Sequence, residues 1–171
     1  MGLETVAIVC FVVLWWRLWP RPLEEELPPE LRGTRLVYSE RLFRSPGPVL
    51  ITAKVDRVHR KAKGALVLVE LKTREVPRAY RSDVIELSAQ RVALMAQTGE
   101  SVADHAYVLT ERPDGRRTGC HRVRLMEPVD LIALVARREK LLAGKAEPQP
   151  TCAPGMCQKC AFVRPCDPPW R

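Results

Sequence analysis

The segment LVLVELKTR, residues 66–74, places two charges inside an apolar run. Its alternation of Leu and Val predicts a strand. Side chains alternate between the two faces of a strand, so Glu70 and Lys72 point the same way. Burying two charged groups without partners costs free energy. A fold that contains this strand must therefore bring other polar groups to Glu70 and Lys72.

The composition is that of a folded chain with a basic balance. Of the 171 residues, 46% are hydrophobic, which excludes a disordered chain, and the length suits one domain with appendages. Lys and Arg number 28 against 20 Asp and Glu, which gives a formal net charge of +8. This excess favours an anionic partner, either nucleic acid or an anionic lipid surface, although many basic proteins bind neither.

The first 19 residues are typical of a membrane anchor. Residues 5–19 are apolar except for Thr5 and Arg17. A helix of this length spans about 22 Å, less than a hydrocarbon core of about 30 Å, but its tryptophans and flanking arginines suit a bilayer interface. No positive charge precedes the run, which disfavours a cleaved signal peptide. We expect a membrane-associated chain with its domain in the cytoplasm; the alternative is a helix docked on the domain or on a partner.

A Pro- and acid-rich linker, residues 20–33, leads into a domain at 34–145 and a Cys-rich tail at 146–171. The patterns in the domain predict three strands, a helix, two further strands and a second helix. We expect strands at 34–43, 47–58 and 65–73, a helix at 84–99, strands at 104–111 and 118–126, and a helix at 128–144. This order predicts an α/β fold, a mixed sheet flanked by helices.

Asp56 lies near the end of the second expected strand, and Glu70 and Lys72 lie on the third. If these strands are neighbours, the three groups converge. Two close carboxylates repel unless a cation lies between them, and carboxylate oxygens suit Mg²⁺ or Mn²⁺. Such a cation polarises a phosphoryl oxygen and activates water, while a lysine neutralises developing charge. These are the parts of metal-assisted phosphodiester hydrolysis; the alternative is a structural network of charges on an edge strand.

Four cysteines lie within 15 positions of the tail: Cys152, Cys157, Cys160 and Cys166. Their sulfurs can close a tetrahedral site on one ion or bind an iron–sulfur cluster. Disulfides are a third alternative, which the expected cytoplasmic orientation disfavours. We expect a metal centre that holds the tail in place.

Residues 54–81 are strongly basic, with nine Lys or Arg against three acidic residues. Contacts of such residues with phosphates give affinity for nucleic acid without reading its sequence. The alternative is an ordinary solvated basic surface. The candidate nucleic-acid-binding residues, with Tyr80 for stacking on a base, are Lys54, Arg57, Arg74, Tyr80 and Arg81.

The spacing of Asp56, thirteen intervening residues and then Glu70-x-Lys72 resembles the signature of the PD-(D/E)xK nucleases. With YSERLF, SAQRVALM and CQKCAFVRPC in the same order, residues 34–166 are similar to the RecB-type exonucleases, particularly the CRISPR-associated Cas-type members and relatives fused to helicases. The resemblance implies a restriction-endonuclease-like fold. It also implies a metal-dependent DNA nuclease that acts as an exonuclease or on single strands and ends.

The resemblance assigns roles to individual positions. Glu40 matches an upstream acidic position, as a further metal-proximal carboxylate or as a solvated strand residue. The other matches are Asp56 and Glu70 as Mg²⁺ or Mn²⁺ ligands with the backbone carbonyl of Leu71, Lys72 as the catalytic lysine, and Gln90 as the glutamine of the following helix. The tail spacing implies a 4Fe-4S cluster, with Zn²⁺ as the alternative.

Two positions depart from the family's pattern. Leu94 stands where the family has a tyrosine four residues after the glutamine. Cys152 stands in for a ligand that the family usually takes from nearer the N-terminus, which leaves Cys120 outside the cluster. The missing tyrosine favours an alternative function, a catalytically weak accessory module that binds DNA ends with the same fold.

Overall fold

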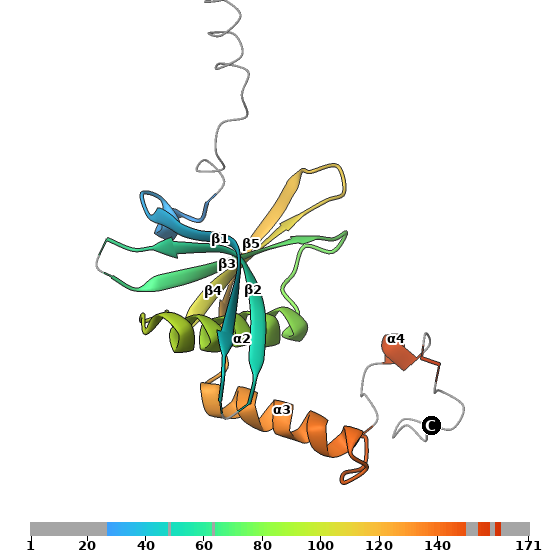
Figure 1. The fold of residues 1–171 in the computed structure, drawn as a ribbon. Coiled ribbons are helices and arrows are strands. Elements are labelled where there is room, and N and C mark those ends of the chain that lie inside the picture. The colour runs from blue at the N-terminus through green and yellow to red at the C-terminus, as the bar shows by residue number, and fades with distance from the viewer. Residues whose placement is uncertain (1–26, 48, 63, 150–153, 158–159, 162–171) are drawn as a thin grey trace, which may run out of the picture.

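The computed structural model describes residues 27–149 apart from positions 48 and 63, together with 154–157, 160 and 161. A short 3-10 helix precedes three consecutive antiparallel strands, which are followed by a helix, two further strands and two helices (Figure 1). The elements are η2 (Pro29–Leu31), β1 (Arg35–Ser45), β2 (Ile51–Arg60), β3 (Leu66–Thr73), α2 (Arg81–Thr98), β4 (His105–Glu111), β5 (Arg117–Arg124), α3 (Pro128–Leu142) and α4 (Pro154–Cys157).

The five strands form one sheet in sequence order, β1-β2-β3-β4-β5. The pairings of β1 with β2, β2 with β3 and β4 with β5 are antiparallel, whereas β3 and β4 run parallel. A parallel pair needs a crossover connection, and α2 supplies it. The expected mixed α/β sheet flanked by helices is confirmed.

Helix α2 covers one face of the sheet (Figure 1). Its buried Leu87, Ala93 and Leu94 belong to the main core, with Leu68 of β3 and Val108 of β4 among their partners. Apolar residues at these helical spacings form one stripe, which the sheet covers. Side chains on the α2 face of β3 are therefore within reach of the helix.

The opposite face of the sheet packs against the segment that precedes β1. Leu27 and Leu31 form a second core with Val69 of β3 and with Tyr107 and Leu109 of β4. Successive residues of β3 thus enter different cores, as strand alternation requires. Both faces of β3 are covered, which explains why its sequence is almost continuously apolar.

Among the described residues, no helix has the length and apolar character needed to cross a bilayer. The expected anchor at 1–19, residues 20–26 of the expected linker, and both Cys152 and Cys166 lie outside the described part of the chain.

Helix α2 begins at Arg81, three residues earlier than its apolar pattern predicts, because Asp83 fixes its first turn. Asp83 is buried and accepts a hydrogen bond from the backbone N of Tyr80 at 2.8 Å. The Arg74 guanidinium, from the loop after β3, donates to both carboxylate oxygens, with distances of 2.9 and 3.0 Å. Burial raises the pKa of Asp83, but the hydrogen bonds from Arg74 outweigh it and hold the pKa below its ordinary value.

We predict that Asp83→Ala lowers the free energy of unfolding by about 2–4 kcal/mol, because it leaves the Arg74 charge and the first turn of α2 without their partner. Urea denaturation at neutral pH measures the loss. The wild-type contribution should fade as the pH falls through the folded-state pKa of Asp83, since a lowered carboxyl pKa stabilises only the ionised form.

The matched control is Arg138→Ala, which removes a salt bridge to Glu139 on the exposed surface of α3. Exposed pairs contribute little, so this variant should stay within about 0.5 kcal/mol of the wild type. Equal effects of the two substitutions would contradict the structural role of the Asp83 pair.

Candidate active site

The candidate site begins where β2 and β3 separate. Their backbone pairing ends at Arg57 and Val69. One residue further, Asp56 Oδ2 accepts a hydrogen bond from the backbone N of Leu71 at 2.9 Å. The Leu71 N–H therefore donates to a side-chain carboxylate rather than to a backbone carbonyl of β2. This hydrogen bond fixes one oxygen of Asp56 beside β3, the strand that carries Glu70.

The Glu70 carboxylate is buried, with only 3% of the residue exposed, and both of its oxygens have partners. Gln90 Nε2, from α2, donates to Oε2 at 2.8 Å. Lys72 Nζ lies 2.7 Å from Oε1. Glu70 follows Leu68 by two residues and therefore lies on the α2 face of the sheet. The structure brings Asp56, Glu70, Lys72 and Gln90 together, and their roles as metal ligands and catalytic groups stay predictions.

Burial is the main cause that raises the pKa of Glu70 above its ordinary value. Hydrogen bonds from Lys72 and Gln90 lower this pKa, whereas the charges of Asp56 and Glu86 raise it further. Asp56 is thus close enough to oppose the ionisation of Glu70. A cation between the two carboxylates would relieve this repulsion.

Lys72 is held by two carboxylates rather than one. Its Nζ contacts Glu70 and also lies 2.8 Å from Glu86 Oε2, on the first half of α2. Burial lowers the pKa of Lys72, but the two carboxylates outweigh it and raise the pKa above its ordinary value. Lys72 is therefore a fixed positive charge at neutral pH.

Glu86 was not among the predicted site residues. The sequence contains a signal for it, because Glu86 precedes Gln90 by four positions and residues at that spacing share one face of a helix. The side chain of Glu86 is 47% exposed, whereas that of Glu70 is 4% exposed. Lys72 therefore bridges a buried carboxylate and a solvent-facing one.

Glu40 lies on β1, and the β1–β2 pairing skips it and Asp56. Its backbone is in the left-handed region, with φ of 52°, which is uncommon for a residue other than glycine. Its exposed carboxylate forms a salt bridge with Lys54. The two predicted site residues Glu40 and Lys54 therefore engage each other on the strands beside Asp56.

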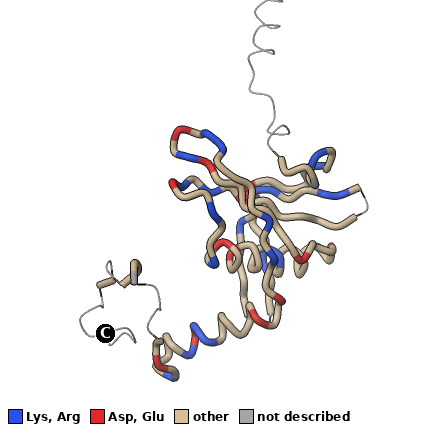
Figure 2. Tube along the Cα trace, turned by 180° about the vertical axis from the view of Figure 1, so that it is seen from behind, with Lys and Arg blue, Asp and Glu red and all other residues tan. Residues whose placement is uncertain are grey.

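The predicted nucleic-acid-binding residues do not form one patch. Arg57 pairs with Val69, whose side chain enters the second core, so Arg57 lies on the sheet face opposite Glu70. The guanidinium of Arg74 is bound to Asp83, and both Arg74 and Arg78 lie over the Tyr80 ring. Arg81 is exposed at the start of α2. Figure 2 likewise shows Lys and Arg spread over several parts of the trace.

Leu94, at the position of the family's tyrosine, is fully buried in the main core. Its side chain packs beneath the sheet and offers no polar group. Gln90, one helical turn earlier, is also buried, and its amide holds Glu70. The described part of α2 thus contributes Gln90 and Glu86 to the site but no tyrosine.

Within the described ranges, no three His, Cys, Asp or Glu side chains are grouped to hold a metal ion, so Glu40 does not complete a set with Asp56 and Glu70. The Glu70 carboxylate is buried, and the charge of Asp56 repels it. Both groups still offer the oxygen ligands that Mg²⁺ or Mn²⁺ prefers.

Two cysteines of the tail lie in the described part of the chain. Cys157 lies in α4, and the backbone N of Cys160 donates to its carbonyl at 3.1 Å.

The family model described as the PD-(D/E)XK nuclease superfamily matches residues 11–167. A search of curated proteins found no match.

Among solved structures, one titled as the crystal structure of SSO0001 is similar to this chain at 15% identity and a TM-score of 0.46. The similarity covers 75% of this chain and 58% of that one. The alkaline exonuclease LHK-Exo from Laribacter hongkongensis is similar at 16% identity and a TM-score of 0.32, with 67% of this chain and 66% of that chain covered.

Proposed function

The chain belongs to the PD-(D/E)XK nuclease superfamily, and we propose that it is a Mg²⁺- or Mn²⁺-dependent DNA nuclease of the restriction-endonuclease-like fold. Within the superfamily we assign it to the RecB-like, Cas-type exonucleases, on the motifs around Glu40, Asp56, Glu70 and Gln90. We further propose that it acts as an exonuclease or on single strands and ends.

The observation that carries the proposal is the convergence of Asp56, Glu70 and Lys72 at the point where β2 and β3 separate. A buried carboxylate beside a second carboxylate is costly for a purely structural role. Asp56 Oδ1 has no hydrogen bond or salt bridge to the described residues, so it can act as a ligand together with Glu70 and the Leu71 carbonyl.

When bound, a divalent cation would polarise the phosphoryl group and lower the pKa of an attacking water. The chain's own residues supply position and charge. Gln90 fixes the orientation of the Glu70 carboxylate, and the Leu71 N–H fixes that of Asp56. The Lys72 ammonium neutralises negative charge that develops on the phosphoryl oxygens, and it stays protonated because of its two carboxylate partners.

Glu86 gives Lys72 a second anchor. If Glu70 turns its Oε1 toward a cation, the ammonium keeps its contact with Glu86 Oε2 at 2.8 Å. We therefore propose Glu86 as a positioning residue that keeps Lys72 beside the scissile phosphate. Its exposed side chain allows this contact without burying a further charge.

An alternative function, a catalytically weak accessory module that binds DNA ends, is favoured by one observation. Leu94 occupies the position of the family's tyrosine and is fully buried, so that contact with substrate is absent from the described part of α2. The complete set of Asp56, Glu70 and Lys72 argues for catalysis.

We predict that Asp56→Asn, Glu70→Gln and Lys72→Met each lower cleavage of labelled DNA by at least about 10³-fold, because each removes a ligand or the charge that stabilises the transition state. Glu86→Gln should lower kcat by only about tenfold with little change in KM, because Lys72 keeps its contact with Glu70. The assay uses single- and double-stranded DNA with Mg²⁺, Mn²⁺ or a chelator.

The matched control is Glu111→Gln on β4, which neutralises a half-buried carboxylate that accepts a hydrogen bond from Thr73 and has no hydrogen bond or salt bridge to Lys72. It should cleave at the wild-type rate. Wild-type activity of Asp56→Asn or Glu70→Gln would refute the assignment of the ligands. DNA binding without cleavage by the wild-type chain would favour the accessory module.

We propose that residues 5–19 attach the chain to a membrane, with the domain in the cytoplasm. The proposal is supported by the apolar run and its tryptophan and arginine flank. The full chain should sediment with membranes, whereas a chain that starts at Pro20 should not. The shortened chain keeps Leu27 and Leu31, which cover the second core. Full-length chain found only in the soluble fraction would contradict the proposal.

We propose that Cys152, Cys157, Cys160 and Cys166 bind a 4Fe-4S cluster, or Zn²⁺ in its place, supported by their spacing. Anaerobically purified protein should contain iron and sulfide, and Cys152→Ser should lose them because all four thiolates pin the site. The control is Cys120→Ser on β5, which should keep the full metal content. Full metal content in Cys152→Ser would refute this ligand set.

A further inference from the structure

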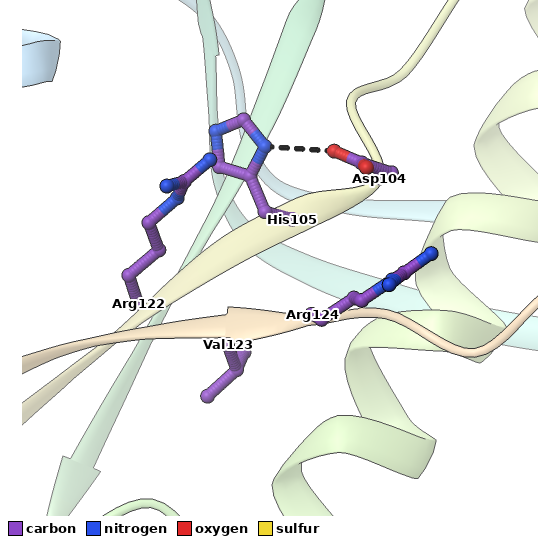
Figure 3. Close-up of a pocket in the computed structure, with 5 residues that line it drawn as sticks. All are labelled: Asp104, His105, Arg122, Val123 and Arg124. Atoms are coloured by element: carbon purple, nitrogen blue, oxygen red, sulfur yellow. Dashed lines mark hydrogen bonds and ion pairs between the residues drawn. The ribbon is translucent and has the colours of Figure 1, made fainter.

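A polar hollow lies away from the proposed active site, on the outer strand pair of the sheet. It has a volume of about 420 Å³ and is lined by Asp104, His105, Arg122, Val123 and Arg124. Figure 3 shows Asp104, His105, Arg122 and Arg124 on one side of the β4–β5 ribbon, while Val123 points to the other side. The polar lining therefore faces one side of the sheet.

This side is the face opposite α2. Tyr107 pairs with Arg122, and the Tyr107 side chain enters the second core, so Arg122 shares its face. Arg124 lies two residues further along β5 and points the same way. The segment that holds Leu27 and Leu31 covers this face over β3 and β4, and both arginines remain exposed on the edge strand β5.

Asp104 and His105 pair with each other in the hollow, whereas the two arginines have no side-chain partner among the described residues. Asp104 Oδ1 lies 3.0 Å from Nδ1 of His105, and that contact is the main cause that lowers the pKa of Asp104. Arg124 is close enough to contribute to this lowering of the pKa, but neither its guanidinium nor that of Arg122 has a hydrogen bond or salt bridge to any described residue. Two guanidinium groups are thus available to an anionic ligand.

The spacing of the two arginines suits a repeating anion. Residues two apart on an antiparallel strand are about 6.8 Å apart, comparable to the separation of neighbouring phosphates in a nucleic-acid strand. Arginine binds phosphate through two parallel N–H donors. The exposed large apolar residues of the described chain lie on other elements, so this surface lacks the side chains that would insert into a lipid bilayer.

We propose that Arg122 and Arg124 form an exosite, a second contact for the phosphodiester backbone of the nucleic acid. The proposal rests on the proposed nuclease function and extends it to the substrate beyond the scissile phosphate. Glu70 pairs with Val108, three residues after His105, and β5 is two strands from β3. Arg122 pairs with Tyr107, the neighbour of Val108, so its backbone is about 10 Å from that of Glu70 in the plane of the sheet. Arg124 is about 14 Å away, and both arginines lie on the other face.

Because of this distance, the contribution of the exosite to binding depends on the length of the nucleic-acid strand. A stacked strand advances about 3.4 Å per nucleotide, so about three to four nucleotide steps span the in-plane separation, and the path around the β5 edge is longer. A trinucleotide cannot reach both contacts, whereas a 20-nucleotide strand can. The exosite therefore binds long substrates and leaves the shortest ones unaffected.

The test measures binding of labelled (dT)20 and (dT)3 to the full chain, with a chelator present to prevent cleavage. We expect Arg122→Gln/Arg124→Gln to weaken (dT)20 binding about tenfold at 100 mM salt and to reduce the slope of log K against log salt by about 1.4, as for two lost single-strand phosphate contacts. Binding of (dT)3 should not change. Arg122→Lys/Arg124→Lys should restore most of the affinity.

The matched control is Arg137→Gln/Arg138→Gln on the exposed side of α3, with the same loss of charge, which should change (dT)20 binding less than twofold. Equal effects of the two double variants would overturn the exosite and leave only a general charge effect. Unchanged (dT)20 binding, with lost sedimentation on phosphatidylserine vesicles, would assign the surface to a membrane instead. Failure of the wild-type chain to bind (dT)20 would refute the proposed function itself.

Discussion

The buried carboxylate of Glu70 is the constraint on which the rest of this site depends. An ionised group that is 3% exposed must have partners, and Gln90 and Lys72 each supply one. Removing either partner leaves a charge in the core, so the helix after β3 must return across the same face of the sheet. The crossover through α2 and the parallel pairing of β3 with β4 meet that requirement.

A second carboxylate, that of Asp56, lies close to Glu70 and makes the site suitable for a cation. Asp56 enters the gap between β2 and β3 and is fixed there by the backbone of Leu71. Its charge opposes that of Glu70 and helps to raise the pKa of Glu70. A structural network would gain stability by separating these two groups. Their proximity is explained most simply by a divalent cation, which stabilises both at once.

Much of this could be predicted from the sequence, and the failures have physical causes. Strand alternation predicts that Glu70 and Lys72 share a face, and the family resemblance places Gln90 in the site. The hydrogen bond from Gln90 to Glu70 was seen only in the structure. The same strand alternation places Arg57 on the face opposite its neighbour Asp56, so its position outside the site could have been predicted. The pairing of Arg74 with Asp83 depends on the path of a loop, which carries no periodic pattern. Glu86 could have been found from its helical spacing to Gln90.

The most direct test of the central claim is the binding of Mn²⁺ to the full chain, counted by electron paramagnetic resonance without any substrate. Mn²⁺ prefers oxygen ligands, so it reports on the carboxylates rather than on the cysteine tail. We predict one Mn²⁺ bound to the wild type and none at the same concentration in Asp56→Asn/Glu70→Gln. Equal binding by both chains would contradict the assignment of Asp56 and Glu70 as a metal site.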